Sequence, residues 1–224
     1  MRILREEDLN KSKDEIASMS YNVCRNAEFP VDKSDVYNHL YGSDGLVSSF
    51  LVNDNNEIVG FGVVQNYNLE INELSATLAY LHGMVIAKEY QGRGYSTEML
   101  RLIYQYFQSD FFGLRTQNPK MAMSMLNLFK KVLIRIPTNT GNDLPKYVME
   151  ELLNLIRQIP PYQDIDDNGI IRNCYPNQLY PDLDELNVIT PNNDLKGNDA
   201  LAVIVQPETT TSRILLPKKV KRIK

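Results

Sequence analysis

The sequence predicts an α/β (α+β) fold in which helices flank a mixed central sheet of about six to seven strands. β-rich runs alternate with amphipathic runs over residues 1–136, which we expect to form the folded core. An irregular acidic stretch at 137–197 is expected to be an insertion, partly helical and available to substrate or partner. Residues 198–224 should supply a last core strand and a basic tail.

The first elements are predicted from apolar spacing and capping residues. Residues 1–5 favour a strand, and residues 7–24 favour a helix because their apolar side chains form an imperfect stripe. A second short helix is expected at 34–40, with Asp32 or Ser34 as its N-cap.

The middle of the chain predicts a hairpin and a further strand. Two β-rich runs, 50–52 and 58–64, surround the polar cluster Asn53-Asp54-Asn55-Asn56, which is typical of a hairpin turn. The next strand is expected at 78–86.

Three elements then follow in quick succession. Residues 97–108 place their apolar side chains on one side of a helix, and residues 113–116 favour the end of a strand. A helix at 119–131 is expected because proline suits the first helical turn.

The proposed insertion differs in composition from the rest of the chain. Residues 137–144 are loop-like, 146–159 favour a helix between prolines, and 162–197 are rich in Asp, Asn, Pro and Tyr. Residues 137–200 hold eleven acidic and four basic residues, a charge near −7, whereas the whole chain carries −4. The apolar run 200–205 then predicts a final strand of the sheet.

Composition narrows the class of protein. A net charge of −4 gives no reason to expect nucleic-acid binding. Cys24 and Cys174 form no C-x-x-C pair, so we expect neither a disulfide nor a metal site. No apolar run has the length of a signal-peptide core or a membrane span. We expect a cytoplasmic protein; the basic segment 217–224 resembles a nuclear-import peptide, but such segments are more often solvated chain ends.

The strongest functional signal is the turn Gln91-Gly92-Arg93-Gly94-Tyr95-Ser96, which joins an apolar strand to a helix. Free N–H groups at a helix start attract anions, and glycines let a phosphate approach the backbone. A P-loop would need a Gly-Lys-Ser/Thr ending, and a dinucleotide motif would need glycine at Thr97. A glycine turn that binds nothing is the plain alternative.

The turn and the strand before it resemble the acetyl-CoA loop of the GNAT N-acetyltransferases. That family reads Gln/Arg-x-x-Gly-x-Gly/Ala after a Val-x-Pro-x-Tyr-like run, and here Ile86-Ala87-Lys88-Glu89-Tyr90 precedes the loop. Lys88 stands in place of the usual proline, and Ser96 stands in place of the last Gly or Ala but is still small enough for a phosphate to approach. The predicted element order over 1–135 also resembles GNAT domains, which admit the cofactor through a splay between their fourth and fifth strands.

The resemblance implies acetyl-CoA as cosubstrate and assigns residues to it. The pantetheine arm is expected on the backbone of Met84, Val85 and Ile86 and on Asn118, which equally suits a helix N-cap. The pyrophosphate is expected on the loop residues Gln91, Gly92, Arg93, Gly94, Tyr95 and Ser96.

A base is needed to deprotonate the amine, and His82 is the candidate. In arylalkylamine-type GNAT enzymes a histidine at a comparable position removes the proton through water, and an ordinary imidazole pKa suits that task. A strand histidine held by one hydrogen bond is the structural alternative. Tyr80, two residues earlier, is expected to line the same channel as a substrate contact. Glu70 and Glu73, expected in a loop, are substitute bases, and His39 is expected to be structural.

The acid that would protonate the departing thiolate is less well marked. Many GNAT enzymes use a tyrosine about seven residues beyond the Asn, where this chain has Met125. Ser124 is the candidate hydroxyl on the same helix. Met121, Met123 and Met125 are expected in the core or as flexible pocket lining.

Three functions follow from these residues. The first is an N-acetyltransferase that acts on a primary amine of a small molecule or peptide, with a small cationic amine favoured by the acidic insertion. The second is an acyl-CoA-binding module without catalysis, favoured by the missing tyrosine. The third is an interaction protein built on the insertion, and a homodimer is open in each case.

Overall fold

The computed structural model describes residues 1–71, 74–128, 132–136, 153–154, 157, 165–166, 170–171, 195–196 and 199–207. The α-helices are α1 (Lys13–Asn26), α2 (Lys33–Tyr41), α3 (Tyr95–Phe107) and α4 (Pro119–Leu128), with 3₁₀ turns at Glu6–Asp8 and Lys88–Tyr90. The strands are β1 (Arg2–Arg5), β2 (Leu46–Val52), β3 (Ile58–Ile71), β4 (Leu74–Ile86), β5 (Phe111–Thr116), β6 (Val132–Ile136), β7 (Ile170–Ile171) and β8 (Ala200–Pro207).

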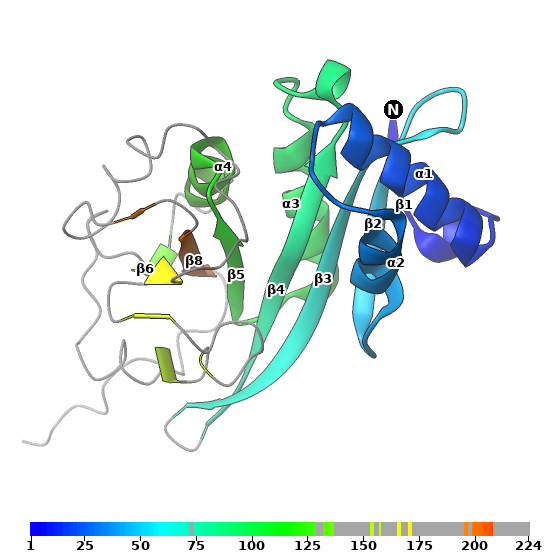
Figure 1. Cartoon of the computed structure of the whole chain (residues 1–224). Helices are drawn as coiled ribbons and strands as arrows, with labels where there is room; N and C mark the ends of the chain where they lie inside the picture. The colour runs from blue at the N-terminus through cyan, green and yellow to red at the C-terminus, as the bar shows by residue number, and fades with distance from the viewer. Residues whose placement is uncertain are drawn as a thin grey trace, which may run out of the picture.

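One mixed sheet joins these strands in the order β1-β2-β3-β4-β5-β8-β6, and the short β7 pairs with β8 (Figure 1). Neighbours pair antiparallel except β4 and β5, which run parallel. The predicted α/β class and mixed sheet are therefore confirmed. The last strand, predicted at 200–205, lies inside the sheet, between β5 and β6.

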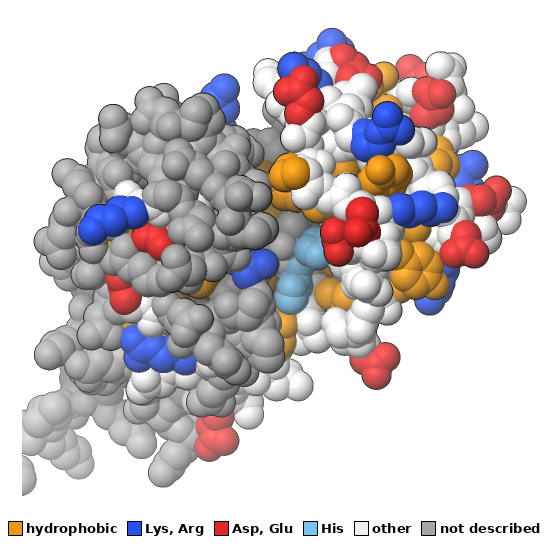
Figure 2. Space-filling model, in the orientation of Figure 1, with side chains coloured by type: hydrophobic (Ala, Val, Ile, Leu, Met, Phe, Trp, Pro, Cys, Tyr) orange, Lys and Arg blue, Asp and Glu red, His pale blue; other side chains and the backbone are white. Residues whose placement is uncertain are grey.

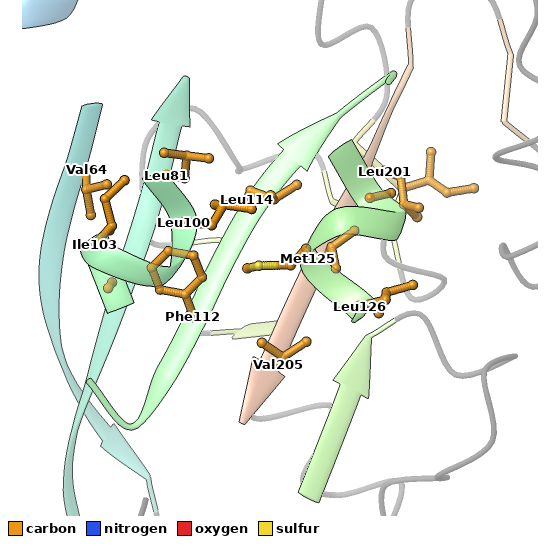
Figure 3. Close-up of a cluster of buried hydrophobic side chains, with 14 of the residues drawn as sticks. Val64, Leu81, Leu100, Ile103, Phe112, Leu114, Met125, Leu126, Leu201 and Val205 are labelled. Carbon is orange, nitrogen blue, oxygen red and sulfur yellow. The ribbon is translucent and has the colours of Figure 1, made fainter. Parts of the chain in front are cut away.

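Helices cover both faces of the sheet, and each face has its own core. Figure 1 shows α1 and α2 in front of β2 and β3, with α3 behind the sheet. On the α1–α2 side, Ile16 and Leu40 pack with Phe50 and Phe61. The opposite core joins α3 and α4 to the later strands (Figure 3); its buried members include Leu81, Leu100, Ile103, Phe112, Leu114, Met125, Val203 and Val205.

Helix α1 begins at Lys13, six residues later than the apolar stripe suggested. Ser12 is its N-cap: the Ser12 hydroxyl accepts from the Glu15 N–H at 3.3 Å, and the Glu15 carboxylate accepts from the Ser12 N–H at 2.8 Å. This capping box sets the start of the helix. The N-cap of α2 is Asp32, one of the two residues predicted.

Strands β3 and β4 are longer than predicted and form an extended antiparallel ribbon. Because the residues after Val64 are mostly polar, the sequence did not predict that β3 continues beyond it. The pairing of β3 with β4 nevertheless extends to Ile71 and Leu74. Glu70 therefore lies exposed on β3 and not in a loop, which corrects the expectation. Glu73 lies outside the described residues.

The C-terminal part of the chain adds strands that were not predicted. Val132–Ile136 forms β6 beside β8, and Ile170–Ile171 forms β7, with both isoleucines buried. A piece of the acidic segment is therefore part of the sheet. The predicted helix at 146–159 and the basic tail lie mostly or wholly outside the described residues. Within the described part, no helix has both the length and the apolarity that crossing a bilayer requires.

Candidate functional site

The sheet opens between β4 and β5. The two strands pair only from Leu78 to Leu81 on β4 and from Phe111 to Leu114 on β5. At the closed end, the Asp110 carboxylate accepts from the Thr77 N–H at 2.8 Å and from its hydroxyl at 3.1 Å. Beyond Leu81 and Leu114 the strands continue without mutual pairing, so the splay expected from the GNAT resemblance is present.

A cavity of about 410 Å³ lies at this splay. Its walls come from the end of α1 and the segment leading into α2, from β3, from β4 and β5, and from the start of α4. The lining along β4 runs from Leu81 to Val85, and along β5 it runs from Leu114 into the segment that ends at Asn118. This volume lies within the range of small-ligand pockets in proteins.

His82 lines the cavity because of an irregularity in β4. The β3–β4 register pairs Val63 with Gly83 and Val64 with Leu81, so His82 is an extra residue without a partner on β3. A β-bulge of this kind redirects a side chain and is common beside functional sites. Figure 2 shows the histidine side chains at the surface of the face toward the viewer.

The surroundings of His82 lower its pKa to about 4, chiefly through burial and secondarily through His39 and Arg115. The imidazole is therefore neutral at pH 7, which suits a proton acceptor. The expectation of an ordinary pKa was wrong because the sequence does not show this burial. Tyr67 contacts the ring through its hydroxyl, 3.1 Å from His82 Nε2, and Tyr80 packs edge-on against it at 5.4 Å between ring centroids.

His39 is the main residue of the site that the sequence reasoning missed. It lies in α2, as expected, but its ring lines the cavity 6.5 Å from that of His82. Gly83 makes room for it, because a Cβ there would lie 2.6 Å from His39 Nε2. Burial lowers the pKa of His39, with a smaller contribution from Arg115. Helical spacing could have revealed it, since Val36 and Leu40 of the same face are buried.

The glycine loop has an open backbone. Gly92 and Gly94 have φ of +73° and +83°, and a Cβ on either would meet nothing within 4 Å. Gly94 is the N-cap of α3 and provides no side-chain cap, so the first-turn N–H groups of the helix follow directly. Arg93 lies over the Tyr90 ring at 5.6 Å, and both loop neighbours Tyr95 and Ser96 are half-buried. This arrangement can accommodate a phosphate.

The loop and the end of β4 are joined by one side chain. Gln91 Nε2 donates to the Ile86 carbonyl oxygen at 2.8 Å. Met84 and Val85 line the cavity and pair on their other side with Gly62 and Phe61 of β3. The predicted pantetheine strand and the predicted phosphate loop are thus consecutive along one edge of the splay.

Asn118 has the capping role that was one of its two alternatives. Its Oδ1 accepts from the Lys120 N–H at 2.9 Å, and its own N–H donates to the Thr116 hydroxyl at 2.8 Å. Asn118 also lines the cavity, on the β5 side of the splay. Its predicted contact with the pantetheine arm is geometrically compatible with that position.

Other predicted residues lie away from the cavity. Tyr80 is 1% exposed and is not among the described residues that line it, so the substrate contact expected there is not supported. Ser124 is half-buried on α4, also outside the lining. Of the three methionines, Met125 is in the core and Met121 lines the cavity, as expected, but Met123 is 42% exposed.

Apart from the two histidines, the described residues of the site offer no reactive thiol and no metal-binding group. Cys24 lines the cavity, but burial raises the pKa of its thiol to about 11, so it stays protonated and unreactive at pH 7. Among the described residues, no group of three or more His, Cys, Asp or Glu side chains could hold a metal ion. Among the described residues that line the cavity, Asp35 and Arg115 carry the formal charges.

A mixed sheet splayed beside a glycine loop at a helix start defines the GNAT-like α/β fold. Residues 15–122 of the chain match the family described as "Acetyltransferase (GNAT) family", so the predicted GNAT resemblance is confirmed. None of the curated proteins compared with the chain matches it.

Several solved structures are similar at low identity. A GNAT family acetyltransferase from Staphylococcus aureus is 16% identical, with a TM-score of 0.36 over 48% of this chain and 76% of the other. An aminoglycoside 6'-acetyltransferase type Ii is 14% identical, with a TM-score of 0.44 over 63% and 90%. A ribosomal-protein-alanine N-acetyltransferase from Brucella melitensis is 11% identical, with a TM-score of 0.37 over 48% and 72%.

Proposed function

We propose that this protein is an N-acetyltransferase that moves the acetyl group of acetyl-CoA to a primary amine. The observation that carries the proposal is the continuity of three parts along one edge of the splay. The open glycine loop at Gly92 and Gly94 is followed inward by the cavity-lining backbone at Val85 and Met84, and then by the neutral imidazole of His82.

In this proposal the cosubstrate follows that edge. The backbone N–H groups of Gln91–Ser96 hold the diphosphate, with Arg93 adding positive charge. The pantetheine arm lies along Met84–Ile86 and reaches Asn118 across the splay. One β4 backbone N–H then polarises the thioester carbonyl, as an oxyanion-hole donor would.

The chemical step is a direct attack of the amine nitrogen on the thioester carbon. The C–N bond forms, the C–S bond breaks, and the thiolate leaves with the bonding electrons. The attacking nitrogen becomes more acidic as it shares its lone pair with the carbonyl carbon. His82 therefore accepts the proton during bond formation, despite its low pKa, and passes it to solvent or to the thiolate.

Departure of the thiolate requires little help from the protein. A free thiol has a pKa of about 8.5, so a thiolate is an acceptable leaving group. Met125 occupies the position of the usual tyrosine and is fully buried, and Ser124 lies outside the cavity lining. Ser124→Ala is therefore expected to reduce turnover by less than about twofold, and a larger loss would identify the Ser124 hydroxyl as the acid.

The acceptor we favour is a small cationic amine. The sequence places eleven acidic and four basic residues between 137 and 200, and an excess of negative charge attracts cations over long range. A peptide amine is the alternative acceptor.

The proposal is tested by calorimetry with CoA and by thiol release from acetyl-CoA with a panel of amines. Wild-type protein should bind CoA and release thiol with at least one amine. Gly94→Glu should weaken CoA binding by at least about tenfold, because it places a negative charge at the phosphate site. Gly45→Glu is the matched control: Gly45 has φ +79°, and a Cβ there meets only Gln65 Nε2 at 3.9 Å.

The same assays separate catalysis from binding. His82→Ala should lower turnover by about a hundredfold or more while CoA affinity changes little. Tight CoA binding without turnover on any amine would instead identify an acyl-CoA-binding module. Absence of CoA binding at millimolar concentration would overturn the proposal.

A further inference from the structure

We infer that Gln65 and Tyr67 fix the tautomer of His82, so that its Nδ1 is the nitrogen that accepts the substrate proton. The two residues are positioning residues of β3, and neither is among the residues that line the cavity. The assignment of Nδ1 to proton transfer rests on the proposed function, but the tautomer itself can be measured without any activity.

A series of hydrogen bonds runs from the backbone carbonyl of Asp44 through Gln65 and Tyr67 to His82. The carbonyl decides which group donates and which accepts in each bond. Gln65 Nε2 lies 3.1 Å from the carbonyl oxygen of Asp44. A carbonyl oxygen accepts only, so the amide group of Gln65 must turn its NH₂ toward Asp44. Its Oε1 then faces the Tyr67 hydroxyl at 2.8 Å.

Tyr67 has one hydroxyl proton, and the hydrogen bond to Gln65 takes it. Because Gln65 Oε1 is an acceptor, the Tyr67 hydroxyl must donate to it. The hydroxyl oxygen is then an acceptor toward His82 Nε2, which lies 3.1 Å away. Neutral His82 therefore carries its proton on Nε2, and its lone pair is on Nδ1.

The opposite assignment fails on the same distances. If Tyr67 donated to His82 Nε2, its oxygen and Gln65 Oε1 would be two acceptors 2.8 Å apart. Turning the Gln65 amide would remove that clash but would place Oε1 against the Asp44 carbonyl oxygen at 3.1 Å. Each alternative leaves two oxygens facing each other without a proton.

The groups around His82 keep the arrangement neutral. His39 of α2 and Arg115 of β5 both disfavour a second proton on the ring, and burial does so more strongly. Burial also raises the pKa of Tyr67, so its hydroxyl stays protonated as a donor. Tyr80 of β4 packs edge-on against the ring.

The test is nitrogen NMR of ¹⁵N-histidine-labelled protein near pH 7. The chain has two histidines, so a His39→Asn variant assigns the signals of His82. Wild-type His82 should show a protonated Nε2 and an unprotonated Nδ1. A dominant Nδ1–H tautomer in the wild-type protein would overturn the inference.

Two variants test the donor-to-acceptor direction of the hydrogen bonds that join Gln65, Tyr67 and His82. Gln65→Leu removes the acceptor, so the Tyr67 proton becomes available to Nε2, and His82 should shift toward the Nδ1–H tautomer. Tyr67→Phe removes both bonds and should leave a mixture of tautomers. Tyr37→Phe, the same change at a 37% exposed tyrosine of α2, should leave the wild-type spectrum unchanged. An unchanged tautomer in Gln65→Leu would contradict the inference.

Kinetics then test the consequence for catalysis. Gln65→Leu should lower kcat by about tenfold or more, with KM and CoA affinity within about twofold, because the Nδ1–H tautomer lacks the base but leaves the binding groups intact. Tyr67→Phe, which keeps a mixture of tautomers, should lower kcat by only about twofold. A normal kcat in a variant whose tautomer has shifted would overturn the role of Nδ1. If no amine is a substrate, the proposed function fails, and the NMR result still decides the tautomer.

Discussion

The extra residue of the β4 bulge is a histidine, and its neighbours decide its protonation. Burial, His39 and Arg115 all disfavour the imidazolium ion, which holds the pKa of His82 at about 4. Because a folded-state pKa below the unfolded value of about 6.5 means that the unfolded chain binds the proton more readily, acid favours unfolding.

This effect predicts a measurable pH dependence of stability. As the pH falls from about 6.5 to about 4, the wild-type protein should lose unfolding free energy that His82→Gln does not lose, by up to about 3 kcal/mol. Above about pH 7 the contribution is absent. Denaturant titrations of both proteins at several pH values measure it, since carboxylate effects cancel in the difference. Parallel curves for the two proteins would show that His82 titrates normally.

At the level of elements, the site depends on where two strands stop pairing. β4 and β5 are held together at one end by four residue pairs and by the Asp110 carboxylate on Thr77, and they diverge past Leu81. The bulge at His82 and the cavity begin at that divergence. The same strand therefore contributes to the core before position 82 and to the site after it.

The start of α1 offers a matched test of local stability. Ser12→Ala removes the N-cap acceptor and should lower the unfolding free energy by about 1 kcal/mol. Ser18→Ala is the control, because Ser18 donates to the Asp14 carbonyl inside the helix, where alanine is at least as favourable. Denaturant unfolding measures both. Equal effects of the two changes would show that the capping box does not stabilise the helix.

The sequence predicted the elements that have strong local signals. The hairpin turn, the glycine loop, the Asn118 cap and the strand at 200–205 were all recognisable from residue type and spacing. Elements whose identity depends on distant partners were missed. Val132–Ile136 becomes a strand because β8 lies beside it, and polar residues up to Glu70 extend β3 because β4 pairs with them.

The site was predicted in the same uneven way. His82 was recognisable as a histidine near the loop, but its low pKa comes chiefly from burial and secondarily from His39 and Arg115, which lie far from it in the sequence. Gln65 and Tyr67 alternate along β3, so both reach the same side, yet no sequence pattern joins them to His82.

At the scale of the whole molecule, charge is distributed unevenly along the chain. The excess of acidic residues between 137 and 200 exceeds the net charge of the entire protein. If this charge attracts the acceptor, kcat/KM for a polyamine should fall as ionic strength rises from about 0.01 to 0.15 M, because the screening length shrinks from about 30 to 8 Å. A monoamine of similar size should respond less. Equal salt dependence for both amines would remove the argument for a cationic acceptor.

The two cores on opposite faces of the sheet support a cavity that opens where the sheet itself divides. α1 and α2 bury one face and α3 and α4 the other, and the cavity has walls from both sides. In the proposed complex the cosubstrate contacts mainly backbone amide groups, and Arg93 and Asn118 are the side chains that contribute. The proposed function therefore depends above all on the binding of CoA by these backbone amide groups.

Hydrogen exchange of backbone amides, measured with and without CoA, tests that claim most directly. CoA should slow exchange in two segments, Gln91–Ser96 at the start of α3 and Met84–Ile86 in the open part of β4, while the amides of Asn53–Asn56 in the β2–β3 turn, which do not line the cavity, keep their rates. Saturating CoA that leaves the exchange of Gln91–Ser96 unchanged would contradict the account.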